Sequence, residues 1–192
     1  MADPIGTVVY EGTLSLRDAR KKYFDAWGFG DGGYEATWVE LKRIAGIPIG
    51  FPNSDGRRRA VKLHDLHHVL TSYRADWTGE AEIGAWEIGA GCRKHYAAWV
   101  LNLLALQYGF WIAPARVLRA LARGRRSAPL YDAAELDEAL LTQSVHAVRA
   151  RLHIPEDDAV RVGVGDVLAL AGWYALGSAI WAWPLLVLAA LL

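Results

Sequence analysis

Residues 60–73 read AVKLHDLHHVLTSY. We predict a helix over this stretch, because strand-like alternation is scarce in the chain. At about 100° per residue, His64 and His68 stand one turn apart on one helix face, with Asp65 beside them. Glu80 follows a predicted turn at residues 74–79 and can fold back from the next helix. Two neighbouring helices thereby gather two imidazoles and two carboxylates.

These donor types suit a divalent metal ion. We predict His64, Asp65, His68 and Glu80 as its ligands, with water able to take an open position. Zinc is the first expectation, and iron, cobalt and manganese are alternatives that donor types alone do not separate. The competing interpretation is a chance cluster of histidines near a solvated helix end. His67 points to one side of the pair, so we expect it to support the site or to be exposed.

The next segment, Glu80–Trp111, is predicted as one long helix. One stripe of it lies within about 80° on a helical wheel and contains Glu80, Gly84, Glu87, Gly91, His95, Ala98 and Asn102. Glycine in a helix interior is unfavourable by about 1 kcal/mol relative to alanine, so Gly84, Gly89 and Gly91 need a reason. Close helix packing and a groove for a long ligand both remain open. Glu87 and His95 are the candidate catalytic groups, for proton transfer.

The predicted fold is all-α, with a single helical domain. Further helices are expected at residues 15–26, 34–45, 114–124 and 133–152, and a loop at residues 46–56. We assign residues 1–155 to a helical metal-binding domain of catalytic type and residues 156–192 to an apolar C-terminal tail. Arg116, Arg119 and Arg123 share a helix face, followed by Arg125 and Arg126. They predict either an anion site, for lipid headgroups or an acidic substrate, or a solvated basic face.

No charged residue occurs from Val167 to Leu192. As a helix this segment would span roughly 39 Å, enough to cross a hydrocarbon core of about 30 Å. We therefore expect the tail to anchor the chain in a membrane, with a buried C-terminal helix or a hydrophobic dimer interface as the alternative. Arg149, Arg151 and Arg161 upstream predict that the body stays on the cytoplasmic face of a membrane. The N-terminus shows no signal-peptide pattern.

Composition excludes some classes. Lys and Arg balance Asp and Glu at 21 each, so charge gives no case for a nucleic-acid partner. The single cysteine, Cys92, excludes an internal disulfide. Residues 1–63 contain no histidine, which argues against the phosphohydrolases that use a His-Asp pair with an upstream histidine. A zinc protease of the His-Glu-x-x-His type would need glutamate where Asp65 stands.

The pattern His64-Asp65-x-x-His68, then eleven residues and Glu80, resembles the signature of the coenzyme Q biosynthesis protein 4 family. Residues 69–73 and 76–79 are also similar, and the similarity runs from about residue 10 to Ile154. The resemblance implies an all-helical protein, peripheral to membranes, that binds a divalent metal through the four matching positions. It also implies a role in ubiquinone synthesis. The apolar tail after Ile154 departs from the family pattern.

For function, the resemblance implies oxidative decarboxylation and hydroxylation at the ring carbon that carries the carboxylate of a prenylated aromatic acid. We therefore predict a metal-dependent membrane enzyme of the lyase class, without a flavin or nicotinamide cofactor. The alternatives are a non-catalytic scaffold that binds a quinone precursor and a metal-dependent lipid hydrolase. Expected partners are a lipid-like small molecule, the membrane, other biosynthetic enzymes and a second copy of the chain.

Overall fold

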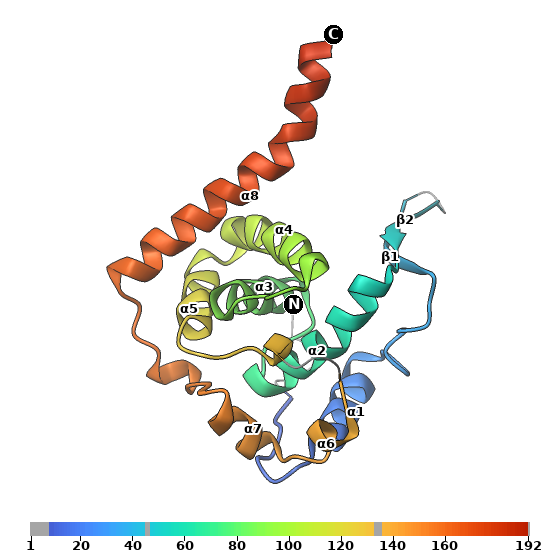
Figure 1. The fold of residues 1–192 in the computed structure, drawn as a ribbon, viewed down its shortest axis with the longest axis vertical. Helices are drawn as coiled ribbons and strands as arrows, with labels where there is room; N and C mark the ends of the chain where they lie inside the picture. Colours follow the sequence, from blue (N-terminus) through green and yellow to red (C-terminus); the bar gives the residue numbers. More distant parts are fainter. Residues whose placement is uncertain (1–7, 45–46, 133–135, 192) are drawn as a thin grey trace.

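The computed structural model describes residues 8–44, 47–132 and 136–191, and for residues 41–44, 47–49, 51 and 183–191 the backbone alone. Within these residues the chain forms eight α-helices, two short 3-10 helices and one β-hairpin (Figure 1). The predicted all-α class is confirmed, with a helical body and one apolar C-terminal helix.

The elements follow one another along the chain with these bounds: α1 (Leu16–Trp27), β1 (Trp38–Ile44), β2 (Ile47–Pro52), α2 (Asp55–Thr71), α3 (Trp77–Ala90), α4 (Tyr96–Ile112), α5 (Pro114–Gly124), η1 (Leu130–Asp132), α6 (Glu138–Leu141), α7 (Val145–Arg151), η2 (Asp157–Ala159) and α8 (Val164–Leu191). Helix α3 lies at the centre of the body, with α4 and α5 packed on it (Figure 1).

The last turn of α2, which holds two of the histidines, is closed by arginines from later in the chain. A helix leaves its final carbonyl groups without partners inside the helix. Arg149 and Arg123 donate to three of these groups, the carbonyl oxygens of Val69, Leu70 and Thr71. Because His67 and His68 lie in this turn, α5 and α7 hold the histidines in place.

The glycines of α3 lie where neighbouring helices approach its backbone. A Cβ atom at Gly89 would lie 2.5 Å from the carbonyl oxygen of Leu121 in α5. A Cβ atom at Gly84 would lie 3.0 Å from that of Ala105 in α4. At these two positions the space of the predicted groove is filled by α5 and α4. Close helix packing accounts for both glycines.

Two segments near the N-terminus differ from the prediction. Residues 38–44 pair antiparallel with residues 47–52, from Trp38 opposite Pro52 to Ile44 opposite Ile47. The predicted helix at residues 34–45 and the predicted loop at residues 46–56 were therefore wrong where they overlap these strands; Ala45 and Gly46 lie outside the described residues. Trp, Val and Ile favour strands, and prolines are tolerated because both strands are edges. The helical spacing in residues 38–44 was too short to decide between the two.

The predicted long helix from Glu80 to Trp111 was also wrong, because it is two helices. Helix α3 ends at Ala90, and Gly91 follows with φ +95°, a backbone conformation that glycine adopts without strain. Helix α4 then begins at Tyr96. The predicted helix at residues 133–152 is likewise divided into the short α6 and α7, and residues 133–135 lie outside the described part.

The basic residues of α5 are mostly engaged within the protein. Arg116 makes a two-pronged ion pair with Glu82, at 2.8 and 2.7 Å. Arg125 and Arg126 bind the buried carboxylate of Asp166 at the start of α8. These three arginines bind carboxylates of the protein itself and so join α5 to α3 and α8, rather than forming the predicted site for an external anion.

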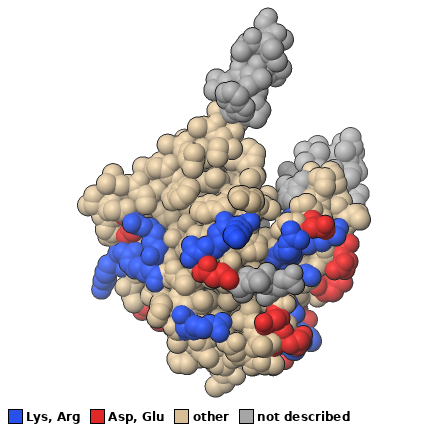
Figure 2. All heavy atoms as spheres, viewed as in Figure 1, with Lys and Arg blue, Asp and Glu red and all other residues tan. Residues whose placement is uncertain are grey.

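Helix α8 is long and apolar enough to cross a membrane over Val164–Ala182. Its first half packs on α4, where Trp173 stacks on Trp99 at 5.2 Å and the ring of Tyr174 lies 4.4 Å from that of Phe110. Its second half extends away from the body (Figure 1). Figure 2 shows that the surface over α8 and α4 carries few charged side chains on this face.

Candidate metal centre

Three donor groups converge between α2 and the first turn of α3. Nε2 of His64 and Nε2 of His68 lie 3.2 Å apart. Glu80 places one carboxylate oxygen 3.5 Å from the first nitrogen and the other 3.4 Å from the second. Among the described residues these three form the group able to hold a metal ion. The predicted folding back of Glu80 onto the histidines is what the structure shows.

The other nitrogen of each ring is already committed. Nδ1 of His68 lies 3.1 Å from the carbonyl oxygen of Tyr73, and Nδ1 of His64 lies 3.0 Å from Oε1 of Glu87. A carbonyl or carboxylate oxygen can only accept, so each Nδ1 carries the proton and donates. In the neutral rings both Nε2 lone pairs therefore face each other. Two lone pairs and a carboxylate in contact repel unless a cation or proton lies between them.

The spacing of the donor atoms suits a small tetrahedral ion. Two ligands held about 2.0–2.1 Å from a tetrahedral zinc ion are about 3.3 Å apart. The observed separations of 3.2, 3.4 and 3.5 Å are close to that value. The side chain of Glu80 is 40% exposed and that of His68 is fully buried. The group therefore opens toward solvent on the side of Glu80.

Asp65, the fourth predicted ligand, is directed elsewhere. Its Oδ2 accepts a hydrogen bond of 2.5 Å from the hydroxyl of Tyr34. Burial raises the pKa of its carboxyl, although His64 and the Tyr34 hydroxyl work in the opposite direction. Asp65 adjoins the converging group in sequence but is not one of its three members.

Glu87 is the hub of a buried network beneath the histidines. Its Oε1 accepts from Nδ1 of His64 and, at 2.6 Å, from Nδ1 of His67. Its Oε2 accepts from Asn102 at 2.6 Å and from the Tyr131 hydroxyl at 2.8 Å. The side chain is fully buried. All four donors point at a carboxylate, so the network fits a charged Glu87.

The electrostatics of the group follow from these contacts. Burial opposes the charge of His64, but Glu87 and Glu80 raise the pKa of its imidazole well above the usual value. Burial alone would raise the pKa of Glu80, yet His68 and His64 hold it well below its ordinary range. Burial also opposes the charge of Glu87, but His64 and His67 hold the pKa of its carboxyl well below the ordinary value. The site therefore attracts positive charge to the point between the rings.

His67 supports the site rather than joining it. It is fully buried, and Nε2 accepts a hydrogen bond of 2.9 Å from the backbone N–H of Leu130. That bond fixes the proton on Nδ1, which faces Glu87. Burial lowers the pKa of His67 and keeps the ring neutral. Of the two alternatives for His67, the structure shows the supporting one.

The second candidate catalytic residue, His95, lies just before α4. Its ring packs on that of Tyr131 at 4.6 Å, and Tyr131 in turn donates to Glu87. Burial lowers the pKa of His95. In the described contacts, His95 is therefore connected to His64, His68 and Glu80 through Tyr131 and Glu87.

Sequence reasoning missed the residues that orient these groups. Tyr34, Tyr73 and Tyr131 come from loops or a 3-10 helix, and no spacing connects them to the motif. Asn102 did lie on the predicted stripe, and it reaches Glu87 from α4. A buried glutamate in an apolar helix, as at position 87, was the one available signal that polar partners had to exist.

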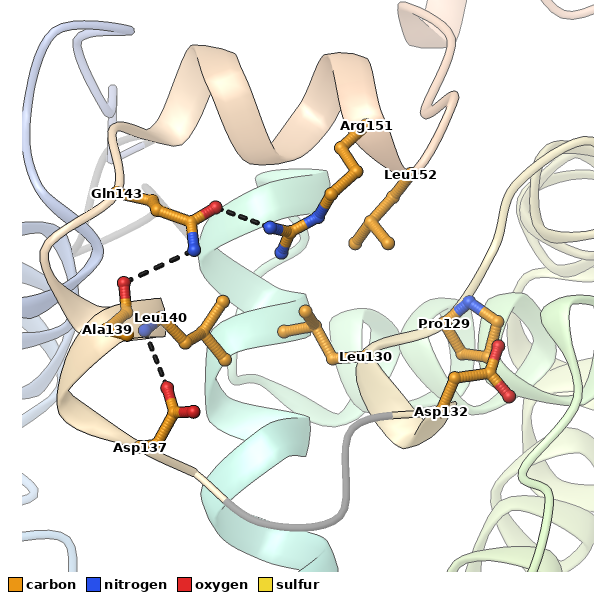
Figure 3. A pocket seen from close by; sticks show the side chains of 9 residues that line it. All are labelled: Pro129, Leu130, Asp132, Asp137, Ala139, Leu140, Gln143, Arg151 and Leu152. Atoms are coloured by element: carbon orange, nitrogen blue, oxygen red, sulfur yellow. Dashed lines mark hydrogen bonds between the residues drawn. The ribbon is translucent and has the colours of Figure 1, made fainter.

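A separate cavity of about 390 Å³ lies among η1, α6 and α7 (Figure 3). Its lining includes Leu130, Asp132, Leu140 and Arg151 and none of the predicted site residues. Arg151 donates to Gln143 at one edge (Figure 3). The cavity adjoins the buried network at η1, where the backbone N–H of Leu130 donates to His67 and the hydroxyl of Tyr131 donates to Glu87.

Comparisons of the chain with protein-family models, with curated proteins and with solved structures gave no match.

Proposed function

We propose that this chain is a metal-dependent enzyme of a membrane, which acts on a prenylated aromatic acid by oxidative decarboxylation and hydroxylation at the carboxylated ring carbon. His64, His68 and Glu80 hold the metal, with zinc as the first expectation. The donor spacing and the resemblance of the motif to the coenzyme Q biosynthesis protein 4 family support this proposal.

The observation that carries the proposal is the pair of facing Nε2 atoms 3.2 Å apart. Each ring is turned so that its proton lies on the far nitrogen, bonded to Tyr73 or Glu87. Metal-bound histidines commonly have such an acceptor on the second nitrogen, which fixes the tautomer and strengthens the ligand. A chance cluster of surface histidines has no reason to share this arrangement.

Three protein ligands suit catalysis because they leave a coordination position for water or for the acid group of a substrate. When bound, the metal would supply a Lewis acid that polarises a carboxylate or ring oxygen. Zinc does not change its oxidation state, so the oxidant would be dioxygen: the carboxylated acid, dioxygen and water give the hydroxylated ring, CO2 and hydrogen peroxide. Glu80 forms the exposed side of the site, so a substrate reaches it from there. Glu87 acts as a positioning residue, because both of its oxygens are already occupied by four donors.

The alternative function is a non-catalytic scaffold that presents a quinone precursor to other enzymes. The exposed apolar face of α4 beside α8 favours it, because a membrane surface collects lipid-like molecules without any chemistry. In that case the metal has a structural role, and its loss unfolds the protein.

Turnover by purified full-length protein distinguishes the two. The protein, in detergent and loaded with each candidate metal, is incubated in air with a prenylated hydroxybenzoic acid. Mass spectrometry follows loss of CO2 and gain of oxygen. Glu80→Gln keeps the size of the side chain and removes the charged ligand. We expect it to remain folded and to lose activity by about 100-fold or more.

The matched control is His146→Ala, which removes an exposed histidine of α7. It is expected to retain activity. Binding of the acid by the wild-type protein without any conversion, under all four metals, contradicts the enzyme and supports the scaffold. Release of a headgroup from phospholipid by the same preparation would instead indicate a hydrolase.

A further inference from the structure

Helix α4 has an apolar outer face that no other described element covers. Six large apolar side chains, spaced mainly by four residues, are 43–77% exposed along it: Tyr96, Val100, Leu104, Tyr108, Trp111 and Ile112. Trp77 of α3, 62% exposed, adds its ring beside Tyr108 at 5.7 Å. A continuous exposed strip of this kind on a soluble surface is unusual and marks a contact surface.

Charge indicates what covers it. Helix α4 contains no charged residue. The chain has no Asp or Glu between Glu87 and Asp132, whereas the exposed Lys94 precedes α4 and the exposed Arg119 follows it, within α5. An apolar strip with aromatic rings, preceded and followed along the chain by exposed cations, suits a bilayer that contains anionic headgroups.

Continuity with α8 gives the second argument. Gln107 of α4 donates to the carbonyl oxygen of Tyr174 at 2.8 Å and accepts from Ser178 at 3.0 Å. Aromatic stacking between Trp99 and Trp173 joins the helices further along. In α8, Val167, Leu168, Leu176 and Ile180 are 45–66% exposed. The strip on α4 and the exposed face of the membrane-length helix thus adjoin. Charged side chains gather at the start of α8, around Asp166, and Figure 2 shows few over the rest of its described part.

We propose that the outer face of α4 and α8 form one lipid-embedded surface, so that α4 rests in the bilayer rather than in water. If α8 alone entered the bilayer, the body would be attached at one point and could turn about it. If α4 also lies in the lipid, one side of the body always faces the membrane. This inference goes beyond the proposed chemistry and does not depend on the metal.

The test places a polarity-sensitive fluorophore on single cysteines in the full-length chain. Cys92 is buried, and Cys92→Ala removes it as a competing thiol. Val100→Cys, Leu104→Cys and Tyr108→Cys report on α4, and Glu138→Cys in α6 is the aqueous control. The protein is reconstituted into vesicles of phosphatidylcholine with phosphatidylglycerol. Quenching by bromine-labelled lipid and by aqueous iodide is then compared.

The expected result is strong quenching by lipid and protection from iodide at all three α4 positions, with the reverse at position 138. Iodide quenching at the α4 positions in vesicle-bound protein overturns the inference, because α8 alone is then anchored. Protection from iodide without lipid quenching also overturns it, since a protein partner or second copy then covers α4. Recovery of the chain in the aqueous fraction does so as well.

These fluorescence outcomes do not depend on catalysis, so a protein without any turnover could still show α4 in the bilayer. Far-ultraviolet circular dichroism, measured in parallel on each cysteine variant, verifies that the helical body remains folded.

Discussion

The buried carboxylate of Glu87 lies 3.0 Å from Nδ1 of His64, on the opposite side of the ring from Nε2. The same oxygen binds His67 at 2.6 Å. One side chain thus sets the tautomer of a candidate ligand and of the ring that supports it. In this arrangement α3 supplies both a candidate ligand, Glu80, and the carboxylate of Glu87, which orients His64 and His67.

Glu87→Gln is therefore expected to weaken metal binding by about 10–100-fold. The amide NH2 of glutamine cannot accept the hydrogen bonds that one carboxylate oxygen of Glu87 now accepts, so buried donors would lose their acceptor. The free energy of unfolding should therefore also fall, by about 2–4 kcal/mol. Competition with a chromogenic chelator measures the affinity, and urea unfolding measures the stability.

Glu82→Gln is the matched control, because Glu82 is another buried carboxylate of α3 but is bonded to Arg116. It should leave the metal affinity unchanged. Equal affinity of the Glu87 variant and the wild-type protein would show that the buried network does not orient the ligands.

Asp76 caps the helix that carries Glu80, and its Oδ1 accepts from the N–H of Gly79 at 2.8 Å. Partial burial opposes its charge, but this bond and the guanidinium of Arg74 lower the pKa of Asp76 below its usual 3.8. The unfolded chain then binds the proton more tightly than the folded one. The stabilisation is complete above the unfolded pKa and is lost as the pH falls through the lower folded value.

We expect Asp76→Ala to lower the free energy of unfolding by about 0.5–2 kcal/mol near neutral pH. The difference from wild type should persist at about pH 5 and narrow as the pH falls below about 4. Urea titrations across this range measure it. Asp55→Ala, at an exposed helix start, should change stability by less than about 0.5 kcal/mol. If the difference in free energy of unfolding between wild type and Asp76→Ala grew as the pH fell, the lowered pKa of Asp76 would be wrong.

Gly89→Ala tests whether the glycines of α3 serve helix packing. Its Cβ would lie 2.5 Å from the carbonyl oxygen of Leu121 and 2.9 Å from the backbone nitrogen of Arg125. Because both contacts are backbone atoms, α5 must shift, and we expect a loss of about 1–3 kcal/mol. Thermal or urea unfolding measures the change.

Gly56→Ala in α2 is the companion variant, because its Cβ would meet nothing within 4 Å. Alanine there should be neutral or stabilising by up to about 1 kcal/mol. If Gly89→Ala also left the free energy of unfolding unchanged or raised it, α3 and α5 would not approach each other as closely as the structure has them.

The sequence predicted the parts of the fold that rest on local patterns. The His64–His68 spacing gave the shared helix face, and Pro114 marked the start of α5, which the structure has at that residue. The division of the predicted long helix depends on Gly91, whose positive φ no helical wheel reveals. The hairpin at residues 38–52 follows from pairing between segments, which helical spacing over a few residues does not detect.

The site was predictable where it is local in sequence. His64, His68 and Glu80 lie within one motif, and their convergence follows from two adjacent helices. The bonds to Tyr34, Tyr73 and Tyr131 join segments far apart along the chain, so only the folded structure brings them to the motif. Asp65 illustrates the limit, because a neighbouring position on the wheel did not determine which way its carboxylate is directed.

We propose above that His64, His68 and Glu80 together hold one metal ion. Elemental analysis of the purified full-length protein, after dialysis with zinc, tests it directly. We predict about one ion per chain for the wild-type protein and for His146→Ala, and loss of most of that metal in His64→Ala, His68→Ala and Glu80→Gln, with helical circular dichroism retained. Unchanged metal content in the three folded variants, or no metal in the wild-type protein, would show that these three side chains do not hold a metal ion.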